Sequence, residues 1–159
     1  MRTSMQLPLI RSFGNNTPPT IVTGKRFSGR LFARPESGGT LVAIDTKDGR
    51  VIGSSRFHGY NQEKSEVEIG WTFLAKSHWG GVYNGEMKRL MLRHAFRFVN
   101  SVIFLVGPQN WRSQRAVEKI GGVRVGTRPD ASGRDSIIYQ ITASDYAAAE
   151  IGRAENSPV

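Results

Sequence analysis

The stretch Glu66–Gly85 reads EVEIGWTFLAKSHWGGVYNG and changes its period halfway along. Over Glu66–Leu74, apolar side chains alternate with polar or small ones, which predicts a β-strand. The apolar side chains are expected to share one face of that strand: Val67, Ile69, Trp71 and Phe73. The segment Ser77–Gly85 then forms a glycine-containing loop that leads into a helical pattern.

A loop of this kind is suited to binding an anion. The first N–H groups of a helix have no partner within the helix, and the N-terminal end carries a partial positive charge. Gly80 and Gly81 would let the backbone approach a phosphate closely. An ordinary strand-to-helix turn explains the two glycines equally well, because isolated glycine motifs often occur in proteins that bind no phosphate there.

The residues before this stretch predict two more strands, Thr40–Asp45 and Val51–Tyr60. An Asp48-Gly49 step lies between them and indicates a tight turn. Three consecutive strands with short connections make an antiparallel meander. Residues 1–38 carry turn and linker chemistry and are expected to be irregular, with at best a short helix over Lys25–Ala33.

After the loop, the pattern predicts a helix over Asn84–Val99. Its expected apolar stripe is Met87, Leu90, Met91, Ala95, Phe98 and Val99, while its basic residues are expected largely off the stripe: Lys88, Arg89, Arg93 and Arg97. Val102–Val106 is wholly apolar and is typical of a buried strand. Asn110–Ile120 predicts a second helix with Asn110 as its N-cap and Gly121 just beyond its end.

Two further strands, Val123–Val125 and Ser136–Ile141, and a terminal helix over Asp145–Ile151 complete the chain. Because a strand, a helix and a second strand form a βαβ unit, the strands Glu66–Leu74 and Val102–Val106 should run parallel. The sequence therefore predicts an α+β (mixed α/β) fold with a single mixed sheet and helices on its faces. The domain is expected over residues 39–151, followed by a tail over 152–159.

Composition narrows the functional classes. The chain has 159 residues, of which 38% are hydrophobic, and no cysteine. Disulfides, thiolate metal sites and a cysteine nucleophile are excluded. The three histidines match no metal-ligand spacing, so no metal is expected. The sequence shows no apolar run of membrane-spanning length, and we expect a soluble, cytoplasmic protein.

The net charge of +9 is concentrated in residues 85–134, where ten Lys/Arg oppose three Asp/Glu, a balance of +7. Such a surface attracts polyanions. Charge alone leaves three interpretations open: a nucleic-acid binder, an enzyme that holds a nucleotide cofactor, or a solvated basic surface.

The motifs resemble one family. Glu68–Trp71 (EIGW), His78–Tyr83 (HWGGVY) and the later spacing Asn110, Ser113, Lys119 and Gly121 are similar to the acetyl-CoA-binding core of GNAT acetyltransferases, in particular the RimJ/RimL-like branch. The resemblance runs from about residue 39 to residue 125.

This resemblance implies that the third strand splays from its parallel neighbour and that acetyl-CoA, a cosubstrate, binds in the gap. Pantetheine would contact Trp71, Thr72, Phe73 and Leu74. The pyrophosphate would lie on the loop and the helix start: His78, Trp79, Gly80, Gly81, Val82, Tyr83, Asn84 and Gly85. The thioester would lie near Asn110 and Ser113. The implied reaction is direct acetyl transfer to a primary amine of a protein N-terminus, an amino acid or a small molecule.

Two features depart from the family pattern. Val82 replaces the second loop glycine, and a valine is costly there if the position needs a positive φ. The N-terminal region is short, whereas family members usually begin with a strand and two helices that build the acceptor pocket.

Two residues are candidates for catalysis. Glu68, on the face opposite Trp71, could take a proton from the acceptor ammonium or hold a water that does so; a strand glutamate in solvent or in a salt bridge is the competing interpretation. Ser113 could hydrogen-bond the leaving thiolate or simply make a local backbone bond. His58 and His78 could carry protons. Arg112, Arg115 and Lys119 are candidates for binding the 3′-phosphate or the adenine edge of CoA.

Two alternatives to the enzyme remain: a non-catalytic acyl-CoA-binding module and, less favoured, a basic nucleic-acid-binding domain, for which no recognition motif is present in the sequence. A homodimer is plausible because exposed strand edges pair readily.

Overall fold

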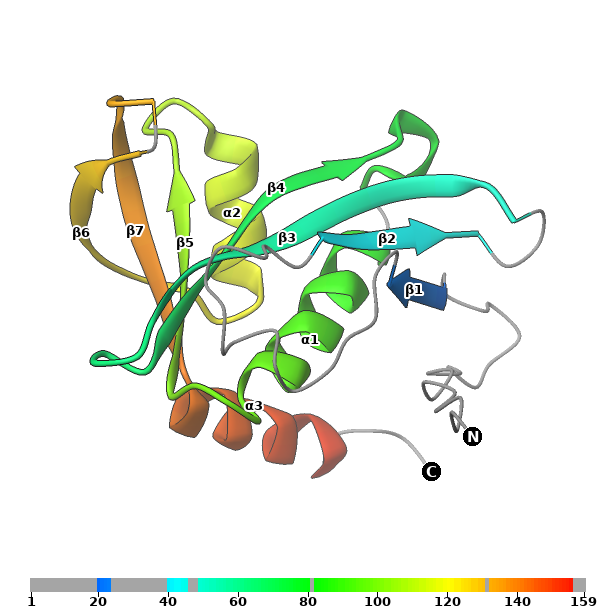
Figure 1. Ribbon diagram of the computed structural model, residues 1–159. Coiled ribbons are helices and arrows are strands. Elements are labelled where there is room, and N and C mark those ends of the chain that lie inside the picture. The colour runs from blue at the N-terminus through cyan, green and yellow to red at the C-terminus, as the bar shows by residue number, and fades with distance from the viewer. Residues whose placement is uncertain (1–19, 24–39, 46–48, 81, 131, 156–159) are drawn as a thin grey trace, which may run out of the picture.

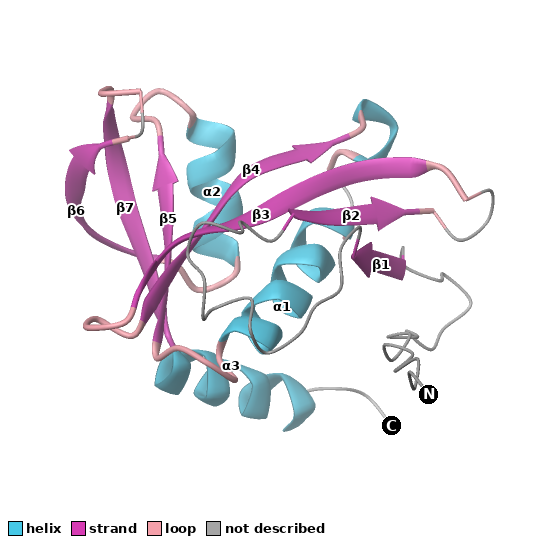
Figure 2. Cartoon of the chain, viewed as in Figure 1, coloured by secondary structure: helices cyan, strands magenta, loops and turns pink. Residues whose placement is uncertain are grey.

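The computed structural model describes residues 20–23, 40–45, 49–80, 82–130 and 132–155. Within these ranges seven strands form one sheet in the order β1-β2-β3-β4-β5-β7-β6 (Figures 1 and 2). The strands are β1 Thr20–Thr23, β2 Thr40–Ile44, β3 Val51–Asn61, β4 Glu66–Leu74, β5 Ser101–Val106, β6 Val123–Pro129 and β7 Asp135–Thr142. The helices are α1 Tyr83–Ala95, α2 Trp111–Lys119 and α3 Ala143–Glu155.

The sheet is mixed, as the sequence predicts. β2, β3 and β4 form an antiparallel meander. β4 and β5, which precede and follow α1 in the chain, are neighbours in the sheet and run parallel. β5, β7 and β6 are again antiparallel. The predicted α+β fold with a single mixed sheet is confirmed.

One strand lies in the segment that was expected to be irregular. Thr20–Thr23 pairs antiparallel with β2, so that Thr20 is opposite Ile44. This pairing satisfies backbone groups that an edge strand would otherwise leave to solvent. A four-residue strand has too few alternations to stand out against the turn residues around it. The short helix considered over Lys25–Ala33 lies outside the described residues.

The hydrophobic core lies on one face of the sheet, between the strands and helices α1 and α2. Its members form a single cluster that includes Phe57 of β3, Ile69 of β4, Met91 of α1, Phe104 of β5 and Val117 of α2. Because both helices contribute to the same cluster, they cover the same face. We call this the helix face and its opposite the open face.

α1 is shorter than predicted and buries more of its surface. It ends at Ala95, and turns lead to the buried Val99, whose N–H donates to the Ala95 carbonyl at 3.0 Å. Leu92, which the predicted stripe omits, is fully buried, and Lys88, expected largely off the stripe, is only 5% exposed. Lys88 faces the sheet, where its Nζ donates to Ser55 of β3 and Thr72 of β4, so the covered face of the helix is wider than the predicted stripe.

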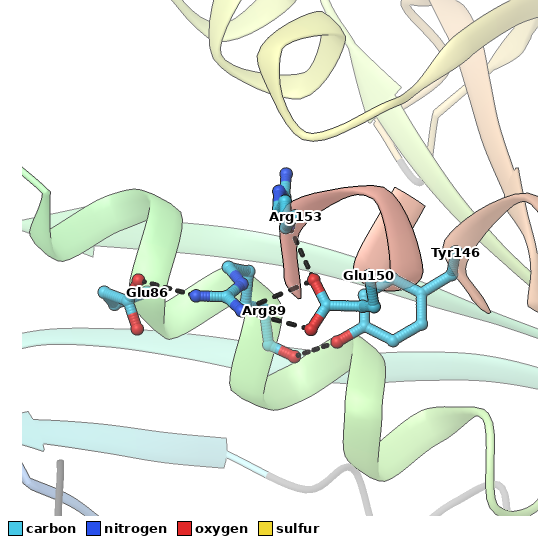
Figure 3. Close-up of polar contacts among 5 residues, drawn as sticks. All are labelled: Glu86, Arg89, Tyr146, Glu150 and Arg153. Carbon is cyan, nitrogen blue, oxygen red and sulfur yellow. Dashed lines mark hydrogen bonds and ion pairs between the residues drawn. The ribbon is translucent and has the colours of Figure 1, made fainter. Parts of the chain in front are cut away.

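α3 extends the predicted terminal helix at both ends and lies beside α1 (Figure 1). A cluster of polar contacts joins the two helices (Figure 3). Arg89 of α1 donates to Glu150 of α3 at 3.1 Å and to Glu86 at 3.0 Å, and Arg153 donates to Glu150 at 2.7 Å. The chain beyond β7 is thereby fixed against the helix that follows β4.

Candidate active site

The parallel pair β4–β5 separates partway along its length. Its ladder consists of three residue pairs and ends where Glu68 faces Ile103, although β4 continues to Leu74 and β5 to Val106. Figure 1 shows the two strands close together at their starts and diverging toward their arrowheads. The predicted splay is confirmed, and Glu68 marks its base.

A β-bulge in β4 coincides with this separation. Trp71 and Thr72 together oppose Ser55 of β3, because Ser54 pairs with Phe73 and Arg56 with Gly70. Trp71 has a φ of +47°, the left-handed region that bulky residues rarely adopt. The extra residue turns the following side chains to the other face of the sheet.

Because of the bulge, the prediction that Trp71 and Phe73 share a face with Val67 and Ile69 is wrong. Val67 and Ile69 point into the core, but Trp71 and Phe73 are on the open face and are 52% and 58% exposed. His58 pairs directly with Glu68, and its ring lies 4.8 Å from the Trp71 ring. Trp71 therefore shares a face with Glu68 and does not oppose it. Strict alternation over nine residues cannot represent a bulge.

Glu68 is a buried carboxylate on the open face, with 7% of its surface exposed. Arg128 of β6 donates to its Oε2 at 3.4 Å. Burial raises the pKa of Glu68, and the nearby charges of His58 and Arg128 oppose that rise only in part. A carboxyl group with a raised pKa beside a strand gap is suited to accepting a proton. Arg128 lies beyond the predicted strand Val123–Val125, and no local pattern links it to Glu68.

Two side chains, those of His78 and Trp79, hold the connection between β4 and α1. Trp79 donates its Nε1–H to the Leu74 carbonyl at 2.7 Å. His78 Nε2 lies 3.7 Å from an Asp45 carboxylate oxygen, and its ring packs edge-on against Tyr83 at 4.8 Å. Trp79 thereby fixes the loop to the end of β4.

The backbone of this loop fits an anion site. Gly80 has a φ of +73°, which a residue with a side chain adopts only with strain. Val82 has a φ of −75° and is the N-cap residue of α1, with no capping side chain among the described residues. Val82 is therefore free of backbone strain. Because no described side chain caps the helix, the N–H groups of Tyr83, Asn84 and Gly85 need a partner from outside it. Gly81 lies outside the described residues.

The N-terminus of α2 is built differently. The Asn110 side chain accepts a hydrogen bond from the Ser113 N–H at 3.2 Å, which confirms the predicted N-cap. Arg112 lies over the Trp79 ring, 4.0 Å from its centroid. A cation from α2 thus reaches the loop that precedes α1.

The structure separates the two proposed catalytic residues. Glu68 lies on the open face, whereas Ser113 is half-buried in the first turn of α2, on the helix face. Arg112 is the basic α2 residue that the structure brings to the loop, while Arg115 and Lys119 are exposed along the helix.

Sequence reasoning missed Lys88. Its Nζ donates to Ser55 Oγ at 3.1 Å and to Thr72 Oγ1, and it lies 5.5 Å from the centroid of the Phe104 ring. The spacing of Lys88, Leu92 and Ala95, at i, i+4 and i+7, places all three on one helix face and could have indicated the burial.

Two negative findings apply to the described ranges. They contain no group of three or more His, Asp or Glu side chains placed to hold a metal ion. None of their helices is long and apolar enough to cross a bilayer.

A family model described as an acetyltransferase (GNAT) domain matches residues 5–123, which includes most of the segment expected to precede the domain. No curated protein matches the sequence significantly. Among solved structures, a candidate acetyltransferase from T. thermophilus is 30% identical, with a TM-score of 0.63 over 80% of this chain and 70% of that one.

Two more distant structures share the fold. An aminoglycoside acetyltransferase in complex with coenzyme A and kanamycin is 22% identical, with a TM-score of 0.62 over 73% of each chain. A spermidine N-acetyltransferase chimera that includes Vibrio cholerae sequence is 17% identical, with a TM-score of 0.61 over 74% of this chain and 73% of that one.

Proposed function

Because the chain belongs to the GNAT acetyltransferase domain family, we propose that it transfers an acetyl group from acetyl-CoA directly to a primary amine. The observation that carries the proposal is the separation of β4 from β5 with Glu68 at its base. We place the chain in the RimJ/RimL-like branch on the spacing of its motifs.

The residues around the gap fit the parts of acetyl-CoA. Beyond Glu68 and Ile103 the facing edges of β4 and β5 share no ladder, so backbone groups of Trp71–Leu74 would pair with the amides of pantetheine, much as another strand would. The loop at Trp79–Val82 and the uncapped start of α1 would hold the pyrophosphate. The neighbours crystallised with coenzyme A support this use of the fold.

Glu68 would act as the general base. An acceptor ammonium must lose a proton before its nitrogen lone pair attacks the thioester carbonyl, and Glu68 would take that proton directly or through a water. The C–N bond forms as the C–S bond breaks, and the thiolate leaves. Ser113 would donate a hydrogen bond from its hydroxyl to that sulfur. The second proton released by the amine nitrogen would pass to the thiolate, so that the products are the acetamide and the free thiol of CoA.

Replacing Glu68 by Gln tests the proposal. We expect turnover, measured as thiol release over a panel of amines, to fall by about 10²–10⁴-fold while the affinity for acetyl-CoA is unchanged, because the amide cannot accept a proton. Glu66→Gln, two residues earlier on β4, is the matched control and should retain activity. Equal turnover of Glu68→Gln and the unmodified protein across the pH range contradicts the role.

The panel also tests the acceptor class and the alternative function. Protein N-termini, amino acids and small amines are the proposed acceptors. Binding of acetyl-CoA in a calorimeter without thiol release for any amine would instead indicate a non-catalytic acyl-CoA-binding module. We also propose that the protein is cytoplasmic and forms a homodimer. Sedimentation of the purified protein measures its oligomeric state.

A further inference from the structure

Lys88 is a buried cation on the helix face, between the strands that form the gap. Its two hydrogen-bond partners are the hydroxyls of Ser55 on β3 and Thr72 on β4. The ring within reach of its Nζ belongs to Phe104 on β5. The amine is therefore bounded by side chains from three neighbouring strands.

These contacts place Nζ inside the separated part of the pair. Thr72 is the second residue of the bulge and lies beyond Glu68, the last β4 residue of the ladder. Phe104 follows Ile103, the last β5 residue of the ladder. Nζ thus touches both sides of the gap at the level where the strands no longer bond to each other. The bulge matters here, because it turns Thr72 toward the helix face.

Within the described ranges no carboxylate pairs with Lys88, and burial lowers its pKa to about 7. A lysine ammonium has three N–H donors. The two hydroxyls accept two of them, and the Phe104 ring accepts no ordinary hydrogen bond. No other described residue accepts the third donor, which is left for an acceptor that enters the gap.

A purely structural role does not explain a lysine here. A methionine of similar length would fill the same space without the cost of desolvating an amine. The hydroxyls of Ser55 and Thr72 already lie 2.9 Å apart and can satisfy each other. The amine therefore adds a donor that the packing does not require.

We propose that Lys88 is a binding residue for the acyl-pantetheine arm and donates a hydrogen bond from Nζ to one of its carbonyl oxygens. The inference rests on the proposed function, since it takes the gap to be the place of that arm. The arm offers two kinds of carbonyl: the thioester, which only acetyl-CoA has, and the pantetheine amides, which free CoA also has.

Calorimetric titration of Lys88→Met with acetyl-CoA and with CoA tests the inference. We expect the dissociation constant for acetyl-CoA to rise at least about tenfold, because a charge-assisted hydrogen bond is lost. If the thioester is the acceptor, the dissociation constant for CoA stays unchanged; if an amide is, both constants rise together. Lys88→Gln keeps a neutral donor and should bind with intermediate affinity, and Lys64→Met, at an exposed turn, should bind normally.

If Lys88 served only to stabilise the fold, Lys88→Met would lower the midpoint of thermal unfolding. We expect instead that this midpoint equals or exceeds that of the unmodified protein, so that weakened binding cannot be attributed to unfolding. A second measurement needs no variant: in isotope-labelled protein, acetyl-CoA should raise the NMR titration midpoint of the Lys88 amine, because an accepted hydrogen bond favours the ammonium.

Unchanged affinity in Lys88→Met, or an unchanged titration midpoint on binding, overturns the inference while leaving the proposed function intact. Failure of the unmodified protein to bind acetyl-CoA is a separate result and overturns the proposed function itself.

Discussion

Trp71 holds a left-handed backbone conformation in the middle of a strand. Such a conformation costs roughly 1–2 kcal/mol for a residue with a side chain, and backbone strain of this kind is concentrated at functional sites. Its consequence is local and specific: Trp71 lies with Glu68 on the open face, and Thr72 meets Lys88 on the helix face.

At the same scale, the unusual pKa of Lys88 predicts how stability depends on pH. The amine titrates near 7 when folded and near 10.5 when unfolded, so the unfolded state binds more protons between those values. Burial of the protonated amine therefore lowers the free energy of unfolding by its full amount below pH 7, and this loss of stability becomes smaller as the pH rises. The groups that contact Nζ, from Ser55, Thr72 and Phe104, do not titrate.

We therefore expect Lys88→Met to raise the free energy of unfolding by about 2–4 kcal/mol at pH 6. The gain should fall by about half between pH 7 and pH 9. Urea denaturation of Lys88→Met and of the unmodified protein at several pH values measures this gain in the free energy of unfolding, with Lys64→Met as the control. A gain that does not depend on pH would contradict the lowered pKa.

At the scale of elements, the two helices that follow β4 and β5 differ at their ends. α2 is capped at its start by Asn110 and ends at Lys119 with Ile120 as its C-cap. The next residue, Gly121, has a φ of +98°. There the N–H groups of Gly121 and Gly122 return to the carbonyls of Glu118 and Val117, both at 3.0 Å, which is a Schellman motif. α1 lacks a capping side chain among the described residues, and only its start is left to accept an anion.

Gly121→Ala tests the end of α2. We expect the free energy of unfolding to fall by about 1–2 kcal/mol, because alanine is strained in the left-handed region. Gly152→Ala is the matched control: Gly152 lies inside α3 with nothing within 4 Å of an added Cβ, so alanine there should raise stability by about 0.5–1 kcal/mol. Equal effects at the two positions would show that the φ of Gly121 does not matter.

At the scale of the whole molecule, the last helix depends on a contact made across the fold. Partial burial raises the pKa of Glu150, but hydrogen bonds from Arg89 and Arg153 outweigh it and leave that pKa below its ordinary value. Tyr146 supports the same junction, since its hydroxyl donates to the Arg89 carbonyl at 3.4 Å (Figure 3). Glu150 thus stabilises the fold when it is ionised.

Glu150→Gln is expected to lower the free energy of unfolding at pH 7 by roughly 0.5–1 kcal/mol, the size of a partly exposed ion pair. A group with a lowered pKa contributes stability above its ordinary pKa and loses it as the pH falls through the lowered one. The difference from the unmodified protein should therefore vanish in acid. Glu155→Gln, at the exposed end of α3, is the control; an equal loss there would exclude a specific role for this contact.

The sequence by itself determined the features that depend on near neighbours. Periodicity predicts the bounds of β4, and capping chemistry predicts the N-cap Asn110 and the termination of α2 before Gly121. The handedness of βαβ units predicts the parallel pairing of β4 with β5. The same local motifs carried the resemblance to GNAT acetyltransferases, and the family match confirms that family.

Only the tertiary structure decided the features that need distant partners. The bulge at Trp71 exists because β4 must match a shorter stretch of β3. Lys88 is buried because three strands close over α1, and Glu68 meets Arg128 because the sheet brings β6 within reach of β4. The contacts of Lys88 and Glu68 join residues 16 to 60 positions apart, and no local period in the chain encodes which of them will meet.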